Sequence, residues 1–189
     1  MTLTNCLREF KVTETLDENN KWYCSECKDH VIAEKTMELY RAPPNLIITL
    51  KRFKTGGQSR YGFSIGGEKL NTLVHFPLEG LDMRDYVLCT EQKQQSKLIY
   101  DCYAISNHYG GLGGGHYTAF AKSVTDNEWY NFDDSRVSKC TSPDDVITTA
   151  AYSLFYRQRG YIEDLNNIDF EKIAKKPDAE YMERAQKKK

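Results

Sequence analysis

The feature that most constrains the fold of this chain is a series of short, strand-like runs of apolar and β-branched residues. The clearest run extends from Leu46 to Leu50, shortly after Pro43 and Pro44, two residues that interrupt regular secondary structure. We interpret this run as a buried strand. Further runs lie at 69–76, 98–108, 116–123, 128–132 and 151–158. Because short turns join several of these runs, the sequence predicts an antiparallel sheet.

Few other segments show regular periodicity. A short helix is predicted at the start of the chain, where Leu3, Leu7 and Phe10 recur at helical spacing behind a cap at Thr2 or Thr4. A second is predicted at 142–150, which begins with Ser142 as the cap and Pro143 in the first turn. Residues 31–39 are interpreted as a strand, and 54–68, which hold five glycines, as a surface loop.

The end of the chain differs in composition from the rest. From Leu165 to Lys189, twelve of 25 residues are charged and the apolar ones are scattered. Such a segment has little apolar surface to bury, so it is predicted to be a loose helix or disordered. We therefore expect one domain over residues 1–160 and a charged tail over 161–189.

Charge and cysteine content exclude several classes of protein. Lys and Arg total 26 against 27 Asp and Glu, a net charge of −1, which argues against binding to nucleic acid. No run reaches the ~18 apolar residues of a membrane span, and the first residues lack the apolar stretch of a signal peptide. Six cysteines are too few for a disulfide scaffold in 189 residues, so we expect a cytoplasmic or nuclear protein.

A glycine-rich motif, YGGLGGGHYTAF at 109–120, surrounds one histidine. Five of the seven residues before His116 are glycines, which allow another backbone, such as an extended peptide substrate, to approach the imidazole closely. The alternative is a glycine-rich hairpin turn whose neighbouring histidine merely begins a strand.

Two carboxylates follow this histidine at a distance that suits a hairpin. In EWYNFDDSRV, a strand that returns beside His116 would bring Asp133 or Asp134 next to the imidazole. A carboxylate that accepts a hydrogen bond from Nδ1–H would orient the ring and leave the other nitrogen to act as a general base. The alternative is an ordinary Asp-Asp-Ser turn.

No cysteine of the chain is a convincing nucleophile for such a pair. Cys6 is predicted inside a helix, Cys102 in a strand, and Cys89 and Cys140 in loops. Cys24 and Cys27 have the Cys-x-x-Cys spacing of a zinc knuckle, which is half of a four-ligand site. His30 is a candidate third ligand, and a redox pair or a metal-free turn are the alternatives.

Taken together, WYCSEC, PPNLIITLKRF, VHFPL, NHYGGLGGGHYTAF, WYNFDDSRV and AYSLFYRQR resemble the C-terminal half of a ubiquitin-specific protease catalytic domain. The resemblance is greatest to the branch whose domain is split by a ubiquitin-like insert. It implies an α+β, papain-like cysteine protease fold, here partial: the palm and part of the zinc fingers. It also implies thiol-dependent hydrolysis of the isopeptide bond after the ubiquitin Gly-Gly terminus, with ubiquitin or polyubiquitin as the partner.

The resemblance assigns roles to individual residues. It makes His116 the catalytic base, Asp133 the orienting acid and Asp134 a carboxylate that assists it. The loops 54–68 and 109–115 correspond to those that line the channel for the ubiquitin tail, with Gly114, Gly115 and Tyr117 beside it. Cys24 and Cys27 correspond to one half of a structural zinc site.

The motif with the nucleophilic cysteine and the first Cys-x-x-Cys of that family do not occur in this sequence. We therefore interpret the chain as one half of a catalytic domain, whose partner is the N-terminal half, and expect it to be inactive alone. The alternative is a non-catalytic module that binds ubiquitin or acts as a scaffold.

Overall fold

The computed structural model describes residues 1–54, 67–89, 91, 98–111 and 113–161. The chain divides into two compact units, Met1–Arg159 and Gly160–Lys189. Apart from Tyr161, the predicted charged tail lies outside the described residues, so its conformation and the boundary at 160 stay predictions. The first unit, Met1–Arg159, contains all the candidate site residues.

This unit contains one α-helix, one short 3₁₀ helix and thirteen strands among its described residues. The helices are α1 (Leu3–Phe10) and η1 (Pro143–Val146). The strands are β1 (Glu14–Thr15), β2 (Trp22–Cys24), β3 (Asp29–Val31), β4 (Glu34–Lys35), β5 (Asn45–Thr49), β6 (Phe53–Lys54), β7 (Glu68–Lys69), β8 (Leu81–Asp82), β9 (Ile99–Gly111), β10 (Gly114–Lys122), β11 (Trp129–Asp133), β12 (Arg136–Lys139) and β13 (Ala151–Gln158).

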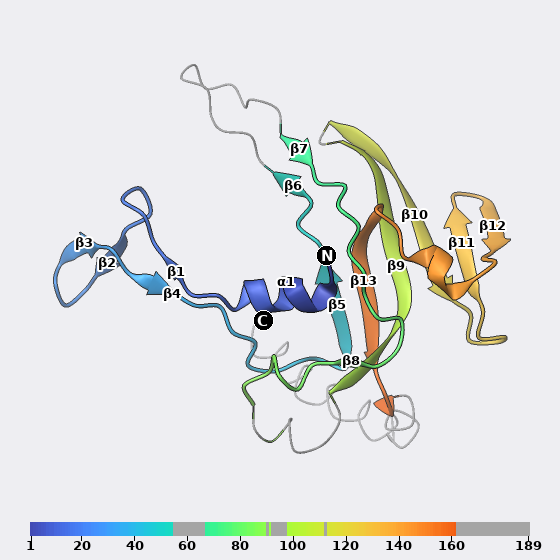
Figure 1. Cartoon of the computed structure of the whole chain (residues 1–189), viewed down its shortest axis with the longest axis horizontal. Helices are drawn as coiled ribbons and strands as arrows, with labels where there is room; N and C mark the ends of the chain where they lie inside the picture. Colours follow the sequence, from blue (N-terminus) through green and yellow to red (C-terminus); the bar gives the residue numbers. More distant parts are fainter. Residues whose placement is uncertain (55–66, 90, 92–97, 112, 162–189) are drawn as a thin grey trace, which may run out of the picture. The chain divides into compact units, whose positions relative to one another are not determined.

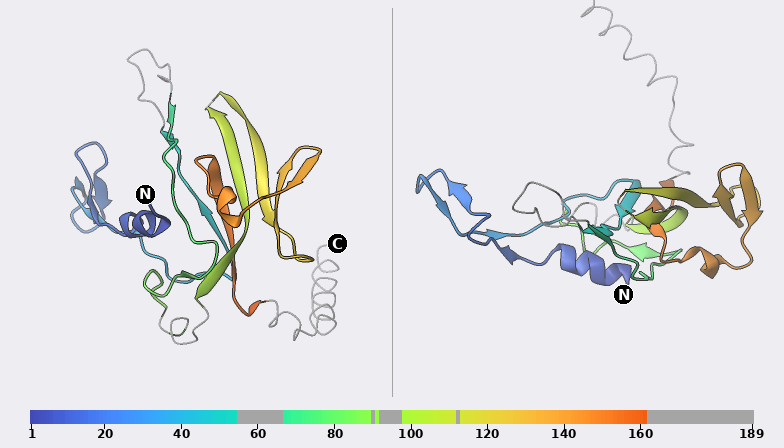
Figure 2. Two further views of the ribbon diagram at one scale, coloured as in Figure 1. Left: turned by 45° about the vertical axis from the view of Figure 1, so that its right-hand side comes forward. Right: turned by 90° about the horizontal axis from the view of Figure 1, so that it is seen from above.

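One large antiparallel sheet dominates the unit (Figure 1). Its strands follow the order β12-β11-β10-β9-β13-β5, and β8 also pairs with β9. Both views of Figure 2 show β9 and β10 side by side, and α1 lies near β5, toward the edge of the sheet opposite β12. The pairs β1–β4, β2–β3 and β6–β7 form separate two-stranded sheets.

The core lies on the face of the sheet where the largest side chains of β9 and β13 point inward. Tyr100 and Ile105 of β9 and Leu154 and Tyr156 of β13 are fully buried. The two tyrosine hydroxyls are satisfied, since Tyr100 donates to the carbonyl of Pro43 at 2.9 Å and Tyr156 to that of Pro77 at 2.7 Å. A buried hydroxyl without a partner is costly. The two hydrogen bonds therefore hold the segments that contain Pro43 and Pro77 against the sheet.

The prediction of an antiparallel sheet is confirmed, as are most of its strands. Four predicted runs correspond to β9, β10, β11 and β13, and the run predicted at 151–158 has the same bounds as β13. The predicted N-terminal helix forms as α1, whereas the helix predicted at 142–150 is confirmed only in part, as the 3₁₀ helix η1 over Pro143–Val146. Thr2 caps α1 by accepting from the backbone N–H of Asn5 at 3.2 Å, and Ser142 caps η1 within a capping box.

Three of the sequence-based predictions are wrong in part. Residues 46–49 of the run predicted at 46–50 lie in a strand, but β5 is the outermost strand of the large sheet, and Ile47 is 58% exposed. Only Lys69 of the predicted strand at 69–76 belongs to a strand, as the last residue of β7, and the predicted strand at 31–39 reduces to Val31 and β4. In each case an apolar sequence pattern does not reveal whether a neighbouring strand is present on both sides.

Strands β12 and β8 are absent from the sequence-based prediction. The four residues of β12, Arg136–Lys139, are all exposed. Their sequence shows no alternation between apolar and polar positions that would mark a strand. Most of the glycine-rich loop predicted at 54–68 lies outside the described residues. No helix of the described part is long and apolar enough to cross a membrane.

The contrast between the core and the sheet edge leads to a stability prediction. Ile105→Ala should lower the free energy of unfolding by about 2–5 kcal/mol, because it opens a cavity at a fully buried position. Ile47→Ala, the same substitution at the exposed edge, should change it by less than about 1 kcal/mol. Urea unfolding of both variants measures the difference, and equal losses would contradict the placement of Ile47.

Candidate functional site

His116 is positioned by the long ladder between β9 and β10. Its register pairs His116 with Tyr109 and Gly115 with Gly110. The glycines are needed here because a Cβ on Gly115 would lie 2.3 Å from His108 Nε2 and 2.3 Å from the Tyr109 carbonyl oxygen. Gly110 adopts a φ of +100°, a conformation that L side chains rarely adopt. The hairpin alternative is therefore confirmed, since the close contacts at Gly115 are with His108 and Tyr109 of the paired strand, and the approach of a peptide substrate to His116 stays a prediction.

Asp133 reaches His116 from the last residue of β11. Ala119 pairs with Phe132, so continuing this antiparallel register places Asp133 opposite Thr118, two residues from His116. Side chains two residues apart lie on the same face of a sheet, within diagonal reach of a facing residue. The structure accordingly places His116 Nε2 and Asp133 Oδ1 2.6 Å apart.

The nitrogen involved differs from the one expected from sequence. We expected the carboxylate to bind Nδ1, but it binds Nε2. The role expected of the carboxylate is the same with either nitrogen, because it still fixes one tautomer of the imidazole ring. The nitrogen left to accept a proton is Nδ1.

The carboxylates also raise the basicity of the imidazole. The hydrogen bond from His116 to Asp133 raises the pKa of His116, and the negative charges of Asp133 and Asp134 act in the same direction, while partial burial opposes them. The two side chains are 48% and 44% exposed, so solvent screens much of this interaction.

Asp134 occupies the turn between β11 and β12. Asp133 pairs with Arg136, which leaves Asp134 and Ser135 as the connecting residues. Asp134 has a φ of +49°, a left-handed conformation that few non-glycine residues adopt. One ligand atom each of His116, Asp133 and Asp134 lies within 4.8 Å of the others. The predicted trio is therefore brought together.

Tyr117 and its aromatic neighbours extend from this site along the hairpin. Tyr117 is 56% exposed, and its ring lies 4.7 Å from that of His108. The centroid of the His108 ring lies 5.3 Å from that of Phe53 and 6.2 Å from that of Tyr152. Gly114 and Gly115 are exposed next to this cluster. The structure does not test whether these residues line a channel for the ubiquitin tail, which stays a prediction.

The sequence reasoning missed His108, Phe53 and Tyr152. His108 is buried, and desolvation together with the charge of Lys69 lowers the pKa of this histidine. Lys69 donates to the His108 carbonyl oxygen. The signal that could have identified His108 is its position opposite Tyr117 in the β9–β10 hairpin.

Cys24 and Cys27 lie on the separate β2–β3 hairpin. The backbone N–H of Cys27 donates to Cys24 Sγ at 3.5 Å, and this hydrogen bond, with smaller contributions from the Cys27 side chain and the Glu26 backbone, lowers the pKa of Cys24. A thiol stabilised as thiolate suits a metal ligand. His30 is paired with Tyr23 and contacts its ring edge-on at 5.3 Å. Among the described residues, these two cysteines form no group of three with another metal-ligating side chain.

A histidine hydrogen-bonded to a carboxylate, on an antiparallel sheet beside a glycine-rich hairpin, is an arrangement in which the imidazole can act as a base while the carboxylate orients it. The chain matches the family described as ubiquitin carboxyl-terminal hydrolase over residues 7–156, and it belongs to that family.

Curated relatives support the same family. The chain is 46% identical over 159 residues to ubiquitin carboxyl-terminal hydrolase 12 of Saccharomyces cerevisiae, a match that covers 84% of this chain and 12% of the relative. It is 44% identical over 158 residues to ubiquitin carboxyl-terminal hydrolase 9 of Arabidopsis thaliana, which covers 84% of this chain and 16% of that protein. It thus spans less than a fifth of the length of these relatives.

Solved structures show a similar fold. The yeast SAGA DUB module with an Sgf73 variant matches with a TM-score of 0.63 and 30% identity, over 84% of this chain and 33% of that chain. The SAGA Ubp8/Sgf11/Sus1/Sgf73 DUB module bound to ubiquitin aldehyde matches with a TM-score of 0.63 and 31% identity, with the same coverage. These matches confirm the resemblance and the papain-like fold predicted from the sequence.

The contact between His116 and Asp133 predicts a shift in the titration of the ring. Replacing Asp133 with Asn should lower the pKa of His116, because the variant removes both the acceptor and its charge. The raised pKa stabilises the fold fully below the unfolded value of about 6.5, and this contribution is lost as the pH rises through the folded value. NMR titration of the His116 ring protons measures the shift. Asp85→Asn is the control, and identical titration in Asp133→Asn and wild type would contradict the pairing.

Proposed function

We propose that this chain supplies the general base and the orienting acid of a thiol-dependent hydrolase that cleaves isopeptide bonds after the Gly-Gly terminus of ubiquitin. The observation that carries this proposal is the 2.6 Å contact between His116 Nε2 and Asp133 Oδ1, which makes Nδ1 the nitrogen that would accept a proton. Membership of the ubiquitin carboxyl-terminal hydrolase family supports ubiquitin as the partner.

In this proposal His116 moves a proton twice. Nδ1 first takes the proton of a cysteine thiol, which forms a thiolate–imidazolium pair, and the thiolate attacks the carbonyl carbon of the last ubiquitin glycine. The imidazolium then gives its proton to the leaving amine, so the isopeptide bond breaks and a thioester remains, which water hydrolyses. Asp133 accepts from Nε2–H throughout and stabilises the imidazolium.

The nucleophile in this proposal comes from a segment outside these 189 residues. Two of the chain's own thiols suit the role poorly. Burial raises the pKa of Cys102 to about 12, and burial together with the charge of Asp145 raises that of Cys140. Such thiols are protonated at neutral pH and react slowly.

The remaining site residues are proposed to serve the substrate and the metal. Gly114 and Gly115 leave room for the extended ubiquitin tail, and Tyr117 flanks it. Cys24 and Cys27 provide two thiolates to a structural zinc whose other ligands lie elsewhere. A cytoplasmic or nuclear location fits cysteines that are all free thiols.

Reconstituted activity tests the catalytic roles. When this chain is combined with a thiol-bearing segment of its family, His116→Ala should reduce turnover of a ubiquitin C-terminal fluorogenic amide on the order of 10³-fold or more, because the thiol loses its base. Asp133→Ala should cost less, and Asp133→Ala with Asp134→Ala should cost more than either alone if Asp134 assists.

The exposed carboxylate Asp85 provides the control, since Asp85→Ala should leave turnover unchanged. A loss with Asp134→Ala alone would reverse the roles of the two carboxylates. Binding of ubiquitin with turnover unaffected by His116→Ala would instead favour the non-catalytic binding module.

Metal binding tests the proposed half-site. The isolated chain should bind Co²⁺ weakly and show a thiolate-to-cobalt absorption band, because two thiolates alone do not close a tetrahedral shell. Cys24→Ser should remove the band and Cys140→Ser should not. Tight one-to-one binding by a monomer would contradict the half-site.

A further inference from the structure

A row of side chains crosses the large sheet and ends at the site around His116. Ala151 of β13 pairs with Asn107 of β9, and Asn107 pairs with Thr118 of β10. The register between β10 and β11 then continues from Thr118 to Asp133. Residues that oppose each other on neighbouring strands point to the same face of a sheet. We call these four residues the cross-strand row.

Burial decreases along the cross-strand row. Ala151 and Asn107 are fully buried, whereas the side chain of Asp133 is 44% exposed. Thr118, which lies between Asn107 and Asp133, is partly buried. The row therefore joins the interior of the sheet to the solvent-exposed pair of His116 and Asp133.

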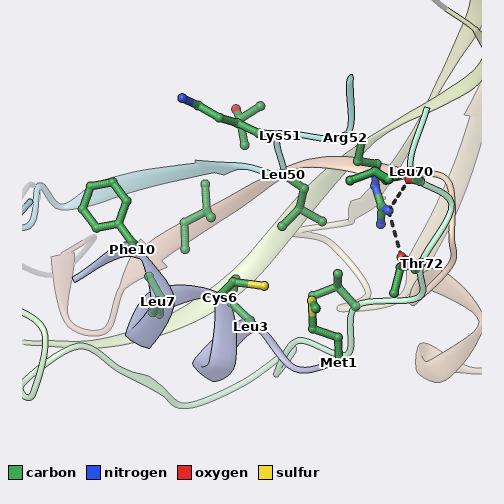
Figure 3. A pocket seen from close by; sticks show the side chains of 13 residues that line it. Met1, Leu3, Cys6, Leu7, Phe10, Leu50, Lys51, Arg52, Leu70 and Thr72 are labelled. Carbon is green, nitrogen blue, oxygen red and sulfur yellow. Dashed lines mark hydrogen bonds between the residues drawn. The ribbon is translucent and has the colours of Figure 1, made fainter. Parts of the chain in front are cut away.

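Arg52 fixes the buried end of the row. Its Nε donates to the carbonyl oxygen of Ala151 at 2.7 Å, and its Nη1 donates to those of Leu70 at 2.9 Å and Thr72 at 2.8 Å. Figure 3 shows the contacts with Leu70 and Thr72. Because Arg52 is itself buried, these charge-assisted hydrogen bonds form away from solvent. The position of Ala151 opposite Asn107 is thus held by a side chain as well as by the sheet.

Asn107 is a polar residue at a fully buried position. Ile105 on the same strand and Ala151 opposite it are apolar and equally buried. Asn107 Oδ1 has no hydrogen-bond partner among the described residues, and an unpaired buried acceptor is costly. An apolar side chain of the same shape would avoid this cost. The presence of the amide is therefore explained by the contact that its nitrogen makes.

The amide nitrogen of Asn107 holds the side chain of Thr118. Asn107 Nδ2 donates to Thr118 Oγ1 at 3.3 Å. A hydroxyl that accepts one hydrogen bond still has its own proton to donate. Because the contact with Asn107 restrains the rotamer of Thr118, that O–H has a defined direction. The next side chain of the cross-strand row is Asp133.

Asp133 has one carboxylate oxygen to receive that proton. Among the described residues, the carboxylate forms a hydrogen bond only with His116, and it does so through Oδ1. Rotation about the last torsion of an aspartate is soft. A carboxylate held at one oxygen can therefore turn away from the imidazole, whereas a second hydrogen bond at Oδ2 would prevent this rotation.

We propose that Asn107 and Thr118 are positioning residues for the pair of His116 and Asp133. Asn107 directs the Thr118 hydroxyl, which donates to Asp133 Oδ2. Oδ1 then stays aligned with His116 Nε2. This inference rests on the proposed function, because it names the residues that keep the proposed base oriented. Neither Asn107 nor Thr118 touches the substrate.

Two substitutions of Thr118 test the hydroxyl in the whole 189-residue chain. NMR titration of the ring protons measures the pKa of His116, which the hydrogen bond to Asp133 raises. Thr118→Val keeps the shape of the side chain but removes the hydroxyl, so this pKa should fall, by less than in Asp133→Asn. Thr118→Ser keeps a hydroxyl and should retain the wild-type pKa. The control is Thr49→Val, which removes a 3.1 Å cross-strand contact with Ser153 elsewhere in the same sheet.

Substitution of Asn107 separates positioning from stability. Asn107→Leu removes the unpaired Oδ1 together with the contact to Thr118, so urea unfolding should show no loss of stability. The pKa of His116 should nevertheless fall, as in Thr118→Val. An amide with a purely structural role would give lower stability and an unchanged pKa of His116. If Asn107→Leu does not fold, the comparison of Thr118→Val with Thr118→Ser decides the question.

Turnover tests the consequence for the reaction. In the reconstituted enzyme, Thr118→Val and Asn107→Leu should each lower kcat by about tenfold or more with KM unchanged, because a misplaced base raises the barrier without altering substrate binding. Thr118→Ser should retain most of the wild-type kcat, and Thr49→Val all of it.

Three outcomes would overturn the positioning role. These are a pKa of His116 in Thr118→Val that equals or exceeds the wild-type value, equal effects of Thr118→Ser and Thr118→Val, and a kcat that survives Thr118→Val although His116→Ala abolishes turnover. A different result separates the two proposals. If Thr118→Val lowers the pKa of His116 but His116→Ala leaves turnover intact, the positioning role stands and the proposed catalytic function fails.

Discussion

The register between β9 and β10 is the constraint on which the rest of the structure depends. β9 pairs with β8, β10 and β13, so it fixes the position of three other strands. Gly115 sets this register locally, because any side chain there would collide with the His108 ring and the Tyr109 carbonyl. A slip of one residue would turn every side chain of β10 to the opposite face and remove His116 from Asp133.

The pair of His116 and Asp133 follows from that register, and its chemistry follows from its exposure. Because each side chain is nearly half exposed, the carboxylate orients the ring and raises the pKa of His116 without the strong coupling of a buried pair. In the proposed function, Nδ1 is the nitrogen that accepts the proton of a thiol brought next to it.

Particular residues show which parts of this arrangement are predictable. The helix caps Thr2 and Ser142 and the run that forms β13 follow from local sequence signals, and the structure confirms each of them. The prediction that Ile47 is buried is wrong because an apolar strand has the same pattern in the centre and at the edge of a sheet. β12 escapes prediction because its four exposed residues are stabilised by pairing with β11 rather than by their own pattern.

The sequence by itself determined the antiparallel sheet, the family, and the juxtaposition of His116 with Asp133 and Asp134, because short turns and motif order constrain residues that are near in sequence. Only the tertiary structure decided which ring nitrogen the carboxylate binds, that His108 packs against Tyr117, and that Arg52 is buried with its Nη2 unpaired among the described residues. These features depend on side-chain orientation and on contacts between residues far apart in the chain, which no local pattern of residues encodes.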